Sequence, residues 1–170
     1  MAIRPTCLVR YSERFADCGC RSTSWGREVK VNVAIDVLRG YRRRALARYP
    51  REYMETLWGR MRDGEVDIYA CYPIDHKGTR DNCQYVGSDI EAQRDEDAPE
   101  HGLTLLGTIH SHPDGSSGPS EADFVTAAGD GDIVSGICQI LRHNGRRRSW
   151  VRFYSGTIHE LKVGRERKAR

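Results

Sequence analysis

The sequence predicts one domain of the α+β class, and three observations indicate it. The chain has 170 residues, and at roughly 150 residues per domain this length suits one domain with short extensions. Stretches with the alternation typical of β-strands are interleaved with stretches of helical spacing, which favours strands and helices in one layer system. Hydrophobic residues make up 38% of the chain and charged residues 30%. This composition is lean, but it lies above the range of disordered proteins.

The first half of the chain is expected to contain a strand, a helix and then a pair of strands. Residues 29–35 alternate between apolar and polar side chains, the pattern of a half-buried strand. Asp36 follows at once and is expected to cap the helix, because its carboxylate can accept hydrogen bonds from backbone N–H groups. Pro50 ends that helix, since it forces the preceding residue out of the α region. The two later strands are separated by Asp63 and Gly64, a pair typical of a tight turn.

The second half is predicted to hold a long polar loop, followed by strands and one more helix. Residues 75–101 are polar and rich in Asp and Glu, and so long a loop in a compact domain is more often functional than accidental. Residues 103–109 are mostly apolar, as in a strand buried on both faces. The polar segment 143–148 predicts a turn between two strands. The predicted strands cover residues 29–35, 53–60, 66–73, 84–87, 103–109, 133–141, 150–154 and 158–163, and the predicted helices cover 36–49 and 121–128.

The balance of charge argues against a module dedicated to nucleic acids. Lys and Arg number 27, Asp and Glu number 24, and the net charge is +3, whereas such modules are usually more strongly basic. Arg42, Arg43 and Arg44 are consecutive on the predicted helix and point in different directions, so a solvated surface is expected there. No stretch approaches the roughly 18 apolar residues of a membrane helix. No secretory signal is visible either, and we therefore expect a cytoplasmic protein without a membrane partner.

Six cysteines are distributed along the chain: Cys7, Cys18, Cys20, Cys71, Cys83 and Cys138. Because no secretory signal is seen, reduced thiols are expected rather than disulfides. Cys18 and Cys20 are separated by one residue, which is closer than the spacing of common zinc sites. A metal site formed by these two residues with Cys7 is the weaker alternative to ordinary thiols.

The strongest functional signal lies in residues 107–124, where two histidines precede a Gly-rich loop and a helix start. His110 and His112 are two apart at the end of a predicted strand, so both imidazoles project from one face and can bind one ion. Asp123 falls in the first turn of the next helix, where its carboxylate can face back. Two histidines and one carboxylate leave one tetrahedral position for water, as in catalytic zinc sites. Ser120 and Asp123 also fit a helix-capping pattern, which is compatible with a metal role because a cap holds the carboxylate in place.

The run HSHPDGSSGPSEAD resembles the JAMM (MPN+) metalloproteases, whose motif is His-x-His-x7-Ser-x-x-Asp. All four positions of the motif are filled, by His110, His112, Ser120 and Asp123. The resemblance looks closest to the prokaryotic members of the family.

The resemblance also implies a fold. It predicts an MPN/JAB domain over residues 29–163, of the three-layer α/β/α type that is similar to cytidine deaminases, with a central mixed sheet flanked by helices. Residues 1–28, which lack periodicity, then form an irregular N-terminal extension, and residues 164–170 form a basic tail.

The family also has a glutamate on an early strand, in a pattern such as Pro-x-Glu-x-x-Gly-x-Leu-x-Gly. Residues 50–59 align with this pattern and place Glu52 in the glutamate position. Glu55 departs from the pattern, because the family often has Gly there. Glu52 and Glu55 are an odd number of residues apart, so a regular strand directs them to opposite faces and only one can face a metal. We favour Glu52, with Glu55 second and Glu65 third.

Read as chemistry, the resemblance implies a zinc-dependent metallopeptidase that hydrolyses peptide or isopeptide bonds. Its cofactor Zn²⁺ would be held by His110, His112 and Asp123. Glu52 would be the general base and then the general acid, and Ser120 would donate a hydrogen bond to the oxyanion.

The substrate and partners implied by the family are ubiquitin-like. The cleaved bond is expected to follow the C-terminal Gly of a ubiquitin-like protein. The expected partners are this protein or its conjugates, together with E1-like or E2-like conjugation proteins.

Three other interpretations remain open from the sequence. RadC-like proteins share a similar run of residues and are associated with DNA, and the arginines at 146–148 and the basic tail are compatible with that class. A peptidase that acts on phage or cell-wall peptides is the second. A non-catalytic MPN binding module is the third, and the intact ligand set argues against it. The acidic residues at 89–100 either contact a basic patch of a substrate or form a solvated loop.

Overall fold

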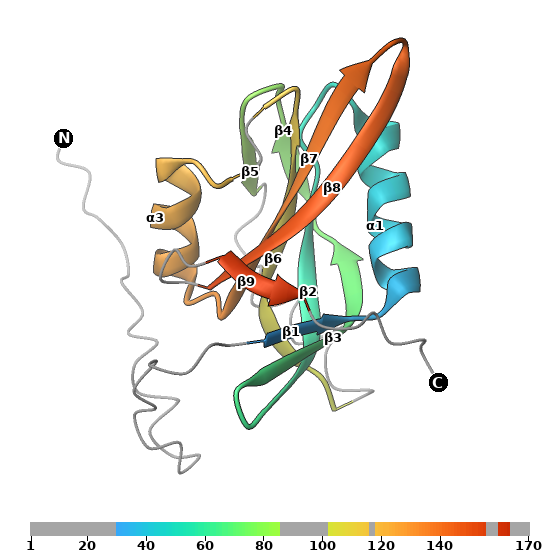
Figure 1. The fold of residues 1–170 in the computed structure, drawn as a ribbon. Helices are drawn as coiled ribbons and strands as arrows, with labels where there is room; N and C mark the ends of the chain where they lie inside the picture. The colour runs from blue at the N-terminus through green and yellow to red at the C-terminus, as the bar shows by residue number, and fades with distance from the viewer. Residues whose placement is uncertain (1–29, 86–101, 116–117, 156–159, 164–170) are drawn as a thin grey trace, which may run out of the picture.

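The computed structural model describes residues 30–85, 102–115, 118–155 and 160–163. They form a strongly curved sheet, with helix α1 on one side and helix α3 on the other (Figure 1). The elements in chain order are β1 (Lys30–Val33), α1 (Ile35–Arg48), β2 (Met54–Arg62), β3 (Glu65–Pro73), β4 (His76–Gly78), β5 (Cys83–Tyr85), β6 (Thr104–Pro113), α3 (Glu121–Asp130), β7 (Val134–His143), β8 (Arg146–Ser155) and β9 (Glu160–Val163).

The described strands of the main sheet follow the order β1-β3-β2-β6-β7-β8-β9, and β1 also pairs with β9, so the sheet closes into a barrel. Strand β1 is parallel to both of its neighbours and β6 is parallel to β7, whereas the other neighbouring pairs are antiparallel. Strands β4 and β5 form a separate two-stranded sheet. The mixed sheet with a helix on each side confirms the predicted α+β class. Closure through β1 was not predicted, because it joins segments from opposite ends of the chain.

The apolar core lies between α1 and the sheet. Helix α1 contributes Tyr41 and Ala45, which are both fully buried. The apolar run predicted as a buried strand forms the first part of β6 and contributes Leu106 and Ile109 to the same core. Because Leu106 and Ile109 pack in this core, they fix the position of β6, which continues into the two histidines of the motif.

The start of α1 differs from the prediction. The helix begins at Ile35, and its N-cap is Ala34, whose side chain makes no capping hydrogen bond. The expectation that Asp36 caps the helix is therefore wrong, because β1 runs almost directly into α1 and the cap position falls two residues earlier. Asp36 lies in the first turn instead, where its negative charge still interacts favourably with the helix dipole.

The hairpin of β7 and β8 is longer than predicted. The segment 143–148 was expected to be a turn, but β7 extends to His143 and β8 begins at Arg146. The turn consists of Asn144 and Gly145, with φ values of 49° and 74°, the left-handed backbone that two-residue hairpin turns require. The hairpin extends well past the neighbouring strands (Figure 1), and it carries arginines that the prediction placed in a loop.

The arginines of α1 are not uniformly solvated, as the sequence analysis expected. Arg44 donates through Nη2 to Glu55 Oε2 over 2.8 Å and through Nε to the other oxygen of the same carboxylate. Glu55 is fully buried, so this is an ion pair between α1 and β2. Arg42 donates to the side chain and the carbonyl of Ser149 on β8, over 2.8 Å each. The solvated interpretation is wrong for Arg44 and incomplete for Arg42.

Several predictions concern residues outside the described part of the chain. These are the N-terminal extension (1–28), the acidic segment (89–100), the basic tail (164–170) and the group Cys7, Cys18 and Cys20. The described cysteines, Cys71, Cys83 and Cys138, are free thiols. Among the described helices, none combines the length and the apolar composition needed to cross a membrane.

Candidate metal centre

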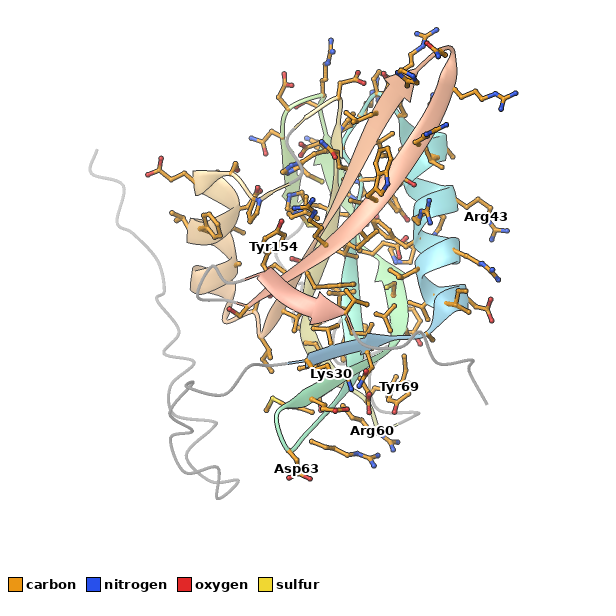
Figure 2. The ribbon with its side chains drawn as sticks, viewed as in Figure 1. Lys30, Arg43, Arg60, Asp63, Tyr69 and Tyr154 are labelled. Atoms are coloured by element: carbon orange, nitrogen blue, oxygen red, sulfur yellow. The ribbon has the colours of Figure 1, made fainter. Side chains whose placement is uncertain are left out.

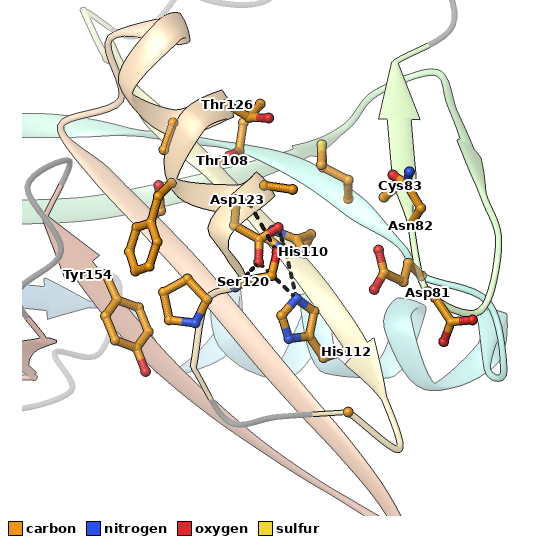
Figure 3. Close-up of a pocket in the computed structure, with 18 of the residues that line it drawn as sticks. Asp81, Asn82, Cys83, Thr108, His110, His112, Ser120, Asp123, Thr126 and Tyr154 are labelled. Carbon is orange, nitrogen blue, oxygen red and sulfur yellow. Dashed lines mark hydrogen bonds and ion pairs between the residues drawn. The ribbon is translucent and has the colours of Figure 1, made fainter.

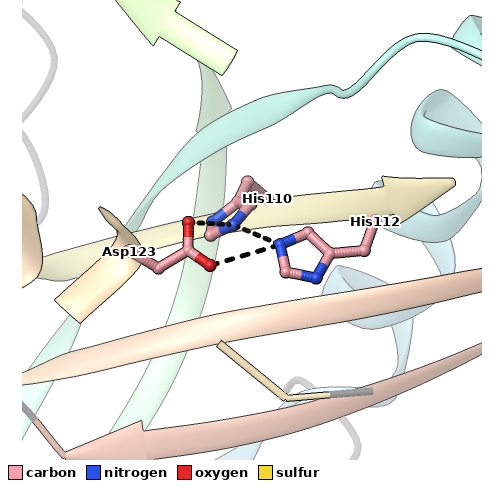
Figure 4. A group of neighbouring side chains, drawn as sticks. All are labelled: His110, His112 and Asp123. Atoms are coloured by element: carbon pink, nitrogen blue, oxygen red, sulfur yellow. Dashed lines mark hydrogen bonds and ion pairs between the residues drawn. The ribbon is translucent and has the colours of Figure 1, made fainter. Parts of the chain in front are cut away.

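Strand β6 presents the two histidines of the motif on one face. His110 and His112 are each 6% exposed, and their Nε2 atoms lie 2.9 Å apart. The planes of the two rings are inclined by 58°. Each ring therefore directs one nitrogen toward a common point beside the strand (Figure 4).

Helix α3 brings Asp123 to the same point. The helix starts after Ser120, whose hydroxyl accepts a hydrogen bond from the Asp123 N–H over 3.2 Å, while the Ser120 N–H donates to Asp123 Oδ2. This reciprocal capping box holds the carboxylate in the first turn. Its Oδ1 lies 3.0 Å from His110 Nε2, and its Oδ2 lies 3.4 Å from His112 Nε2. One side chain thus caps the helix and faces both imidazoles.

The charge of Asp123 is stabilised by its surroundings. Burial opposes ionisation of this carboxyl group, but the hydrogen bonds to His110 and His112 outweigh that effect, with a further contribution from the Ser120 N–H. Together they hold the pKa of Asp123 well below its usual range. The carboxylate is therefore ionised at neutral pH, as a metal ligand must be.

These three side chains fit a transition metal ion. Their ligand atoms all lie within 4.8 Å of one another. Two atoms at about 2.1 Å from a tetrahedral ion are about 3.4 Å apart, close to the observed separations of 2.9, 3.0 and 3.4 Å. Two imidazole nitrogens and a carboxylate suit zinc, and three protein ligands leave a fourth position open. His110, His112 and Asp123 can therefore hold a metal ion.

The three residues lie in a cleft of about 300 Å³ (Figure 3). Helix α3 and the end of β8 form one wall, and the β4–β5 hairpin forms the other. The first wall includes Ser120, Thr126 and Tyr154, and the second includes Asp81, Asn82 and Cys83. Sequence analysis missed the second wall, because the polar residues around it show no periodicity.

Glu52 also lines this cleft, in the segment that leads into β2. It is 8% exposed. Its backbone N–H donates to the Thr79 carbonyl over 2.7 Å. A Cβ at Gly78 would lie 2.1 Å from the Glu52 carbonyl oxygen, so only glycine allows β4 to pass this close. The β4–β5 hairpin thus fixes the backbone from which the Glu52 side chain enters the cleft.

The electrostatic environment of Glu52 differs from that of Asp123. Burial raises the pKa of Glu52 to about 7, the neighbouring His112 opposes this shift, and the charges of Asp123 and Asp81 add to it. A carboxyl group with a pKa near neutrality can accept a proton and release it again at physiological pH. Glu52 has the proton affinity that a general base and acid needs.

Ser111, between the two histidines, joins β6 to the segment that carries Glu52. It is fully buried, and its Oγ accepts a hydrogen bond from Tyr53 N over 2.9 Å. Its own N–H donates to the Tyr53 carbonyl over 2.9 Å, and Tyr41 Oη donates to that carbonyl over 3.2 Å. The residue next to Glu52 is therefore tied to the residue between the histidines. No sequence signal indicated this contact, because it depends on how β2 meets β6.

The other glutamates considered from the sequence lie elsewhere. Glu55 is in the core and paired with Arg44, on the opposite face of β2. Glu65 is at the start of β3, where Lys30 Nζ donates to its Oε1 over 3.0 Å. Neither residue lines the cleft.

Asp114 links the end of the cleft to α1 and to the β4–β5 hairpin. It follows β6 directly and has a φ of 54°. Its Oδ2 accepts a hydrogen bond from Tyr49 Oη over 2.6 Å and lies 3.5 Å from Arg80 Nη2. These contacts bring three separate segments together next to His112. The sequence analysis did not identify Asp114, since it lies in a loop between the two parts of the motif.

Comparison with known proteins places this arrangement in a family. Among solved structures, the fold is similar to that of protein DSY2949 from Desulfitobacterium hafniense, with a TM-score of 0.59 and 19% identity over 81% of this chain and 94% of that one. It also aligns with AF2198, a JAB1/MPN domain protein from Archaeoglobus fulgidus, with a TM-score of 0.48 and 17% identity over 78% and 95% of the two chains. None of the curated proteins compared with the sequence is significantly similar to it. Residues 35–153 match Prok-JAB, the prokaryotic homologs of the JAB domain, and because this match spans most of the chain, the protein belongs to that family.

Proposed function

We propose that the protein is a zinc-dependent peptidase that hydrolyses an amide bond in the cleft between α3 and the β4–β5 hairpin. One observation carries this proposal: three ligand atoms converge within 4.8 Å of one another, beside a carboxyl group whose pKa is about 7. Structural zinc sites usually have four protein ligands, whereas three ligands beside an acid are typical of zinc hydrolases. Membership of the JAB-domain family and the resemblance to JAMM metalloproteases support the same chemistry.

The described residues can perform the remaining steps of hydrolysis. A bound Zn²⁺ would supply a Lewis acid that polarises the scissile carbonyl and acidifies water. Glu52 would accept the proton of the attacking water and then donate it to the leaving amine, and its pKa of about 7 suits both transfers at neutral pH. Ser120 Oγ accepts the Asp123 N–H, so its hydroxyl proton can be donated to the developing oxyanion. Such a donor contributes on the order of 3 kcal/mol to the transition state.

The proposed substrate is a ubiquitin-like protein or its conjugate, cut after the C-terminal Gly. The burial of the site supports a slender acyl group, because His110 and His112 are each only 6% exposed. A glycine carbonyl carries no side chain next to it and can approach such buried groups. The JAMM resemblance supports the same substrate class, and it also favours E1-like or E2-like conjugation proteins as partners.

A cleavage assay tests this proposal. The substrate is a ubiquitin-like protein fused through its C-terminal Gly to a reporter amine. Zinc-loaded protein is expected to release the reporter, a chelator to stop the release, and added zinc to restore it. Glu52→Gln is expected to lower kcat by about 10²–10⁴-fold with zinc retained, because the proton acceptor is lost.

Glu65→Gln is the matched control, since Glu65 lies outside the cleft, and it is expected to keep wild-type turnover. Full turnover of Glu52→Gln would rule out the proposed role of this carboxyl group. If the protein cleaves cell-wall peptides and not the fusion, the proposed peptidase activity stands, but the proposed ubiquitin-like substrate is wrong.

A further inference from the structure

Arginine is concentrated on two neighbouring parts of the molecule, α1 and the β7–β8 hairpin. Residues 35–48 and 134–155 contain ten of the 27 basic residues of the chain, all of them Arg, and one of its 24 acidic residues. The rest of the chain therefore has 17 basic and 23 acidic residues. The net charge of +3 thus combines two arginine-rich segments with a remainder of the sequence that is net acidic. Such an asymmetry attracts anionic partners to one side of a protein.

The arginines lie on both faces of the β7–β8 hairpin, because α1 packs against the face of β8 that carries Arg147, whereas Arg148 and Arg152 lie on the opposite face. Arg147 Nη1 donates to the Leu46 carbonyl over 3.2 Å, and its guanidinium carbon lies 4.4 Å from the centre of the Tyr49 ring. On the outer side of the helix, Arg43 points away from the protein (Figure 2). We define the arginine surface as the exposed residues Arg39, Arg42, Arg43, Arg48, Arg142, Arg146, Arg147, Arg148 and Arg152.

Among the described residues, several arginines of this surface have no carboxylate close by. Arg39 is not one of them, because its Nη1 lies 3.6 Å from Asp36 Oδ1 in an exposed ion pair within α1. In the described part of the chain no carboxylate lies within 4.0 Å of Arg43, Arg146 or Arg148. Adjacent guanidinium groups repel one another, and an anionic partner would relieve that repulsion.

The arginine surface reaches the sheet face that carries the candidate metal centre. In the sheet register, His112 on β6 and Trp150 on β8 are both paired with the same residue of β7. Paired residues project to the same face of a sheet, and two strand spacings correspond to about 10 Å. Trp150 is 48% exposed, and Arg148 and Arg152 flank it on that face. Tyr154, further along the same row, lines the cleft.

We propose that the arginine surface binds an acidic stretch of the polypeptide substrate and so delivers the adjacent amide bond to the cleft. This inference rests on the proposed peptidase function. Guanidinium groups bind carboxylates through paired, charge-assisted hydrogen bonds, and the exposed face of Trp150 adds an apolar contact. At about 3.3 Å per extended residue, the acidic stretch lies roughly three to eight residues from the scissile bond.

The charges of the cleft favour a polypeptide over a nucleic acid. Asp81 lines the cleft, and Asp114 lies at its end beside the arginine surface. A nucleic acid has a phosphate at every nucleotide, so a strand entering the cleft would place phosphates against these carboxylates. A polypeptide can be acidic where it meets the arginines and neutral where it enters the cleft.

Direct binding tests the proposal independently of catalysis. The probe is a fluorescein-labelled octaglutamate peptide, measured by anisotropy with zinc-loaded protein in about 50 mM salt, where charge interactions are weakly screened. R146E/R148E is expected to weaken binding at least about tenfold, because it reverses two charges of the surface. The matched control is R60E/R62E, which reverses two exposed arginines at the end of β2. Figure 2 shows Arg60 at the end of the molecule opposite the tip of the β7–β8 hairpin. The control is expected to bind within about twofold of wild type.

Steady-state kinetics test whether the arginine surface also affects turnover. An acidic stretch placed within eight residues of the cleaved bond is expected to lower the KM of the wild type without changing kcat. In R146E/R148E the same stretch is expected to leave the KM unchanged. Equal peptide binding by both variant pairs would overturn the proposal. Binding of single-stranded DNA at about 150 mM salt, without binding of octaglutamate, would overturn the proposal and indicate a nucleic acid as the partner. If the peptide binds through these arginines but the protein cleaves no substrate, the proposed peptidase function is refuted, and the proposed binding role of the arginine surface is not.

Discussion

Asp123 performs two tasks with one carboxylate. Its Oδ2 accepts the Ser120 N–H at the start of α3, while its two oxygens lie 3.0 and 3.4 Å from the histidine nitrogens. A helix cap and a metal ligand both require a side chain fixed in the first helical turn. The cap therefore preorganises the candidate metal centre before any ion arrives.

This double role predicts different outcomes for two substitutions at Asp123. Asp123→Asn keeps an oxygen that can accept the Ser120 N–H, whereas Asp123→Ala loses the cap. Both variants are expected to bind zinc at least about tenfold more weakly, but Asp123→Ala is expected to lower the free energy of unfolding of the metal-free protein by about 1 kcal/mol more. Zinc competition with a chelator and urea unfolding measure the two effects. Equal stability of the two variants would contradict the capping role.

The raised pKa of Glu52 predicts that the stability of the metal-free protein depends on pH. Burial raises its pKa to about 7 in the folded state, from 4.5 as the ordinary value. Below pH 4.5 the group is protonated in both states, and as the pH rises toward 7 the unfolded chain ionises first, so folding becomes progressively less favourable. Glu52→Gln removes this penalty. It is expected to stabilise the metal-free protein by on the order of 2 kcal/mol at pH 8 and by almost nothing at pH 4.

Urea unfolding of both proteins at the two pH values measures this difference. Glu65→Gln serves as the control, because Glu65 is partly exposed and lies outside the cleft. The same change in stability at pH 4 and pH 8 would show that the carboxyl group of Glu52 is not buried as described.

At the scale of elements, the relation between β2 and β6 decides the geometry of the site. Ser111 and Tyr53 exchange two hydrogen bonds of 2.9 Å each, one step before the strand register begins at Met54 and His110. The contact holds Glu52 on the same side as the histidines, although the two segments are far apart in the sequence.

Ser111→Ala is expected to separate metal binding from catalysis. The substitution leaves the buried Tyr53 N–H without its acceptor, which costs about 1–3 kcal/mol of stability. The histidines remain in place, so zinc binding is expected to stay within about twofold of wild type, whereas kcat falls and KM does not change. Ser111→Thr, which retains a hydroxyl, is expected to recover part of kcat. Loss of zinc from Ser111→Ala would contradict this separation and assign Ser111 a purely structural role.

The elements that carry the motif could be predicted because their signals are local. The apolar run before His110 identifies β6, and the spacing of Ser120 and Asp123 identifies the start of α3. The ends of helices and strands were harder to predict. The prediction treated 143–148 as one loop because its polar residues resemble a turn, although Asn144 and Gly145 suffice to reverse the chain.

Contacts between distant elements could not be predicted from the sequence pattern. The solvated surface expected for Arg44 rested on its charge alone, and its pairing with the buried Glu55 depends on how α1 packs against β2. The β4–β5 wall of the cleft and the position of Asp114 depend on tertiary structure in the same way. The preference for Glu52 over Glu55 came from the alignment with the JAMM pattern, and strand periodicity indicated only that the two point to opposite faces. The structure places Glu52 in the cleft and Glu55 in the core.

At the scale of the whole molecule, the closed sheet supports both the candidate metal centre and the arginine surface. Strand β1 closes the sheet by pairing with both β3 and β9, which fixes the curvature of the surface from which β6 presents the histidines. Arg148 and Arg152 of the β7–β8 hairpin lie on the sheet face of the cleft, so the proposed acidic substrate would be guided toward it over distances comparable to the Debye length, about 8 Å at physiological salt.

The central claim is that His110, His112 and Asp123 hold one zinc ion. Metal analysis of protein refolded or expressed with zinc, followed by gel filtration, tests it most directly. We expect about one zinc per chain in the wild type and in Glu52→Gln, and less than about one tenth of that in His112→Ala. Absence of stoichiometric zinc in the wild type, or its full retention in His112→Ala, would contradict the account.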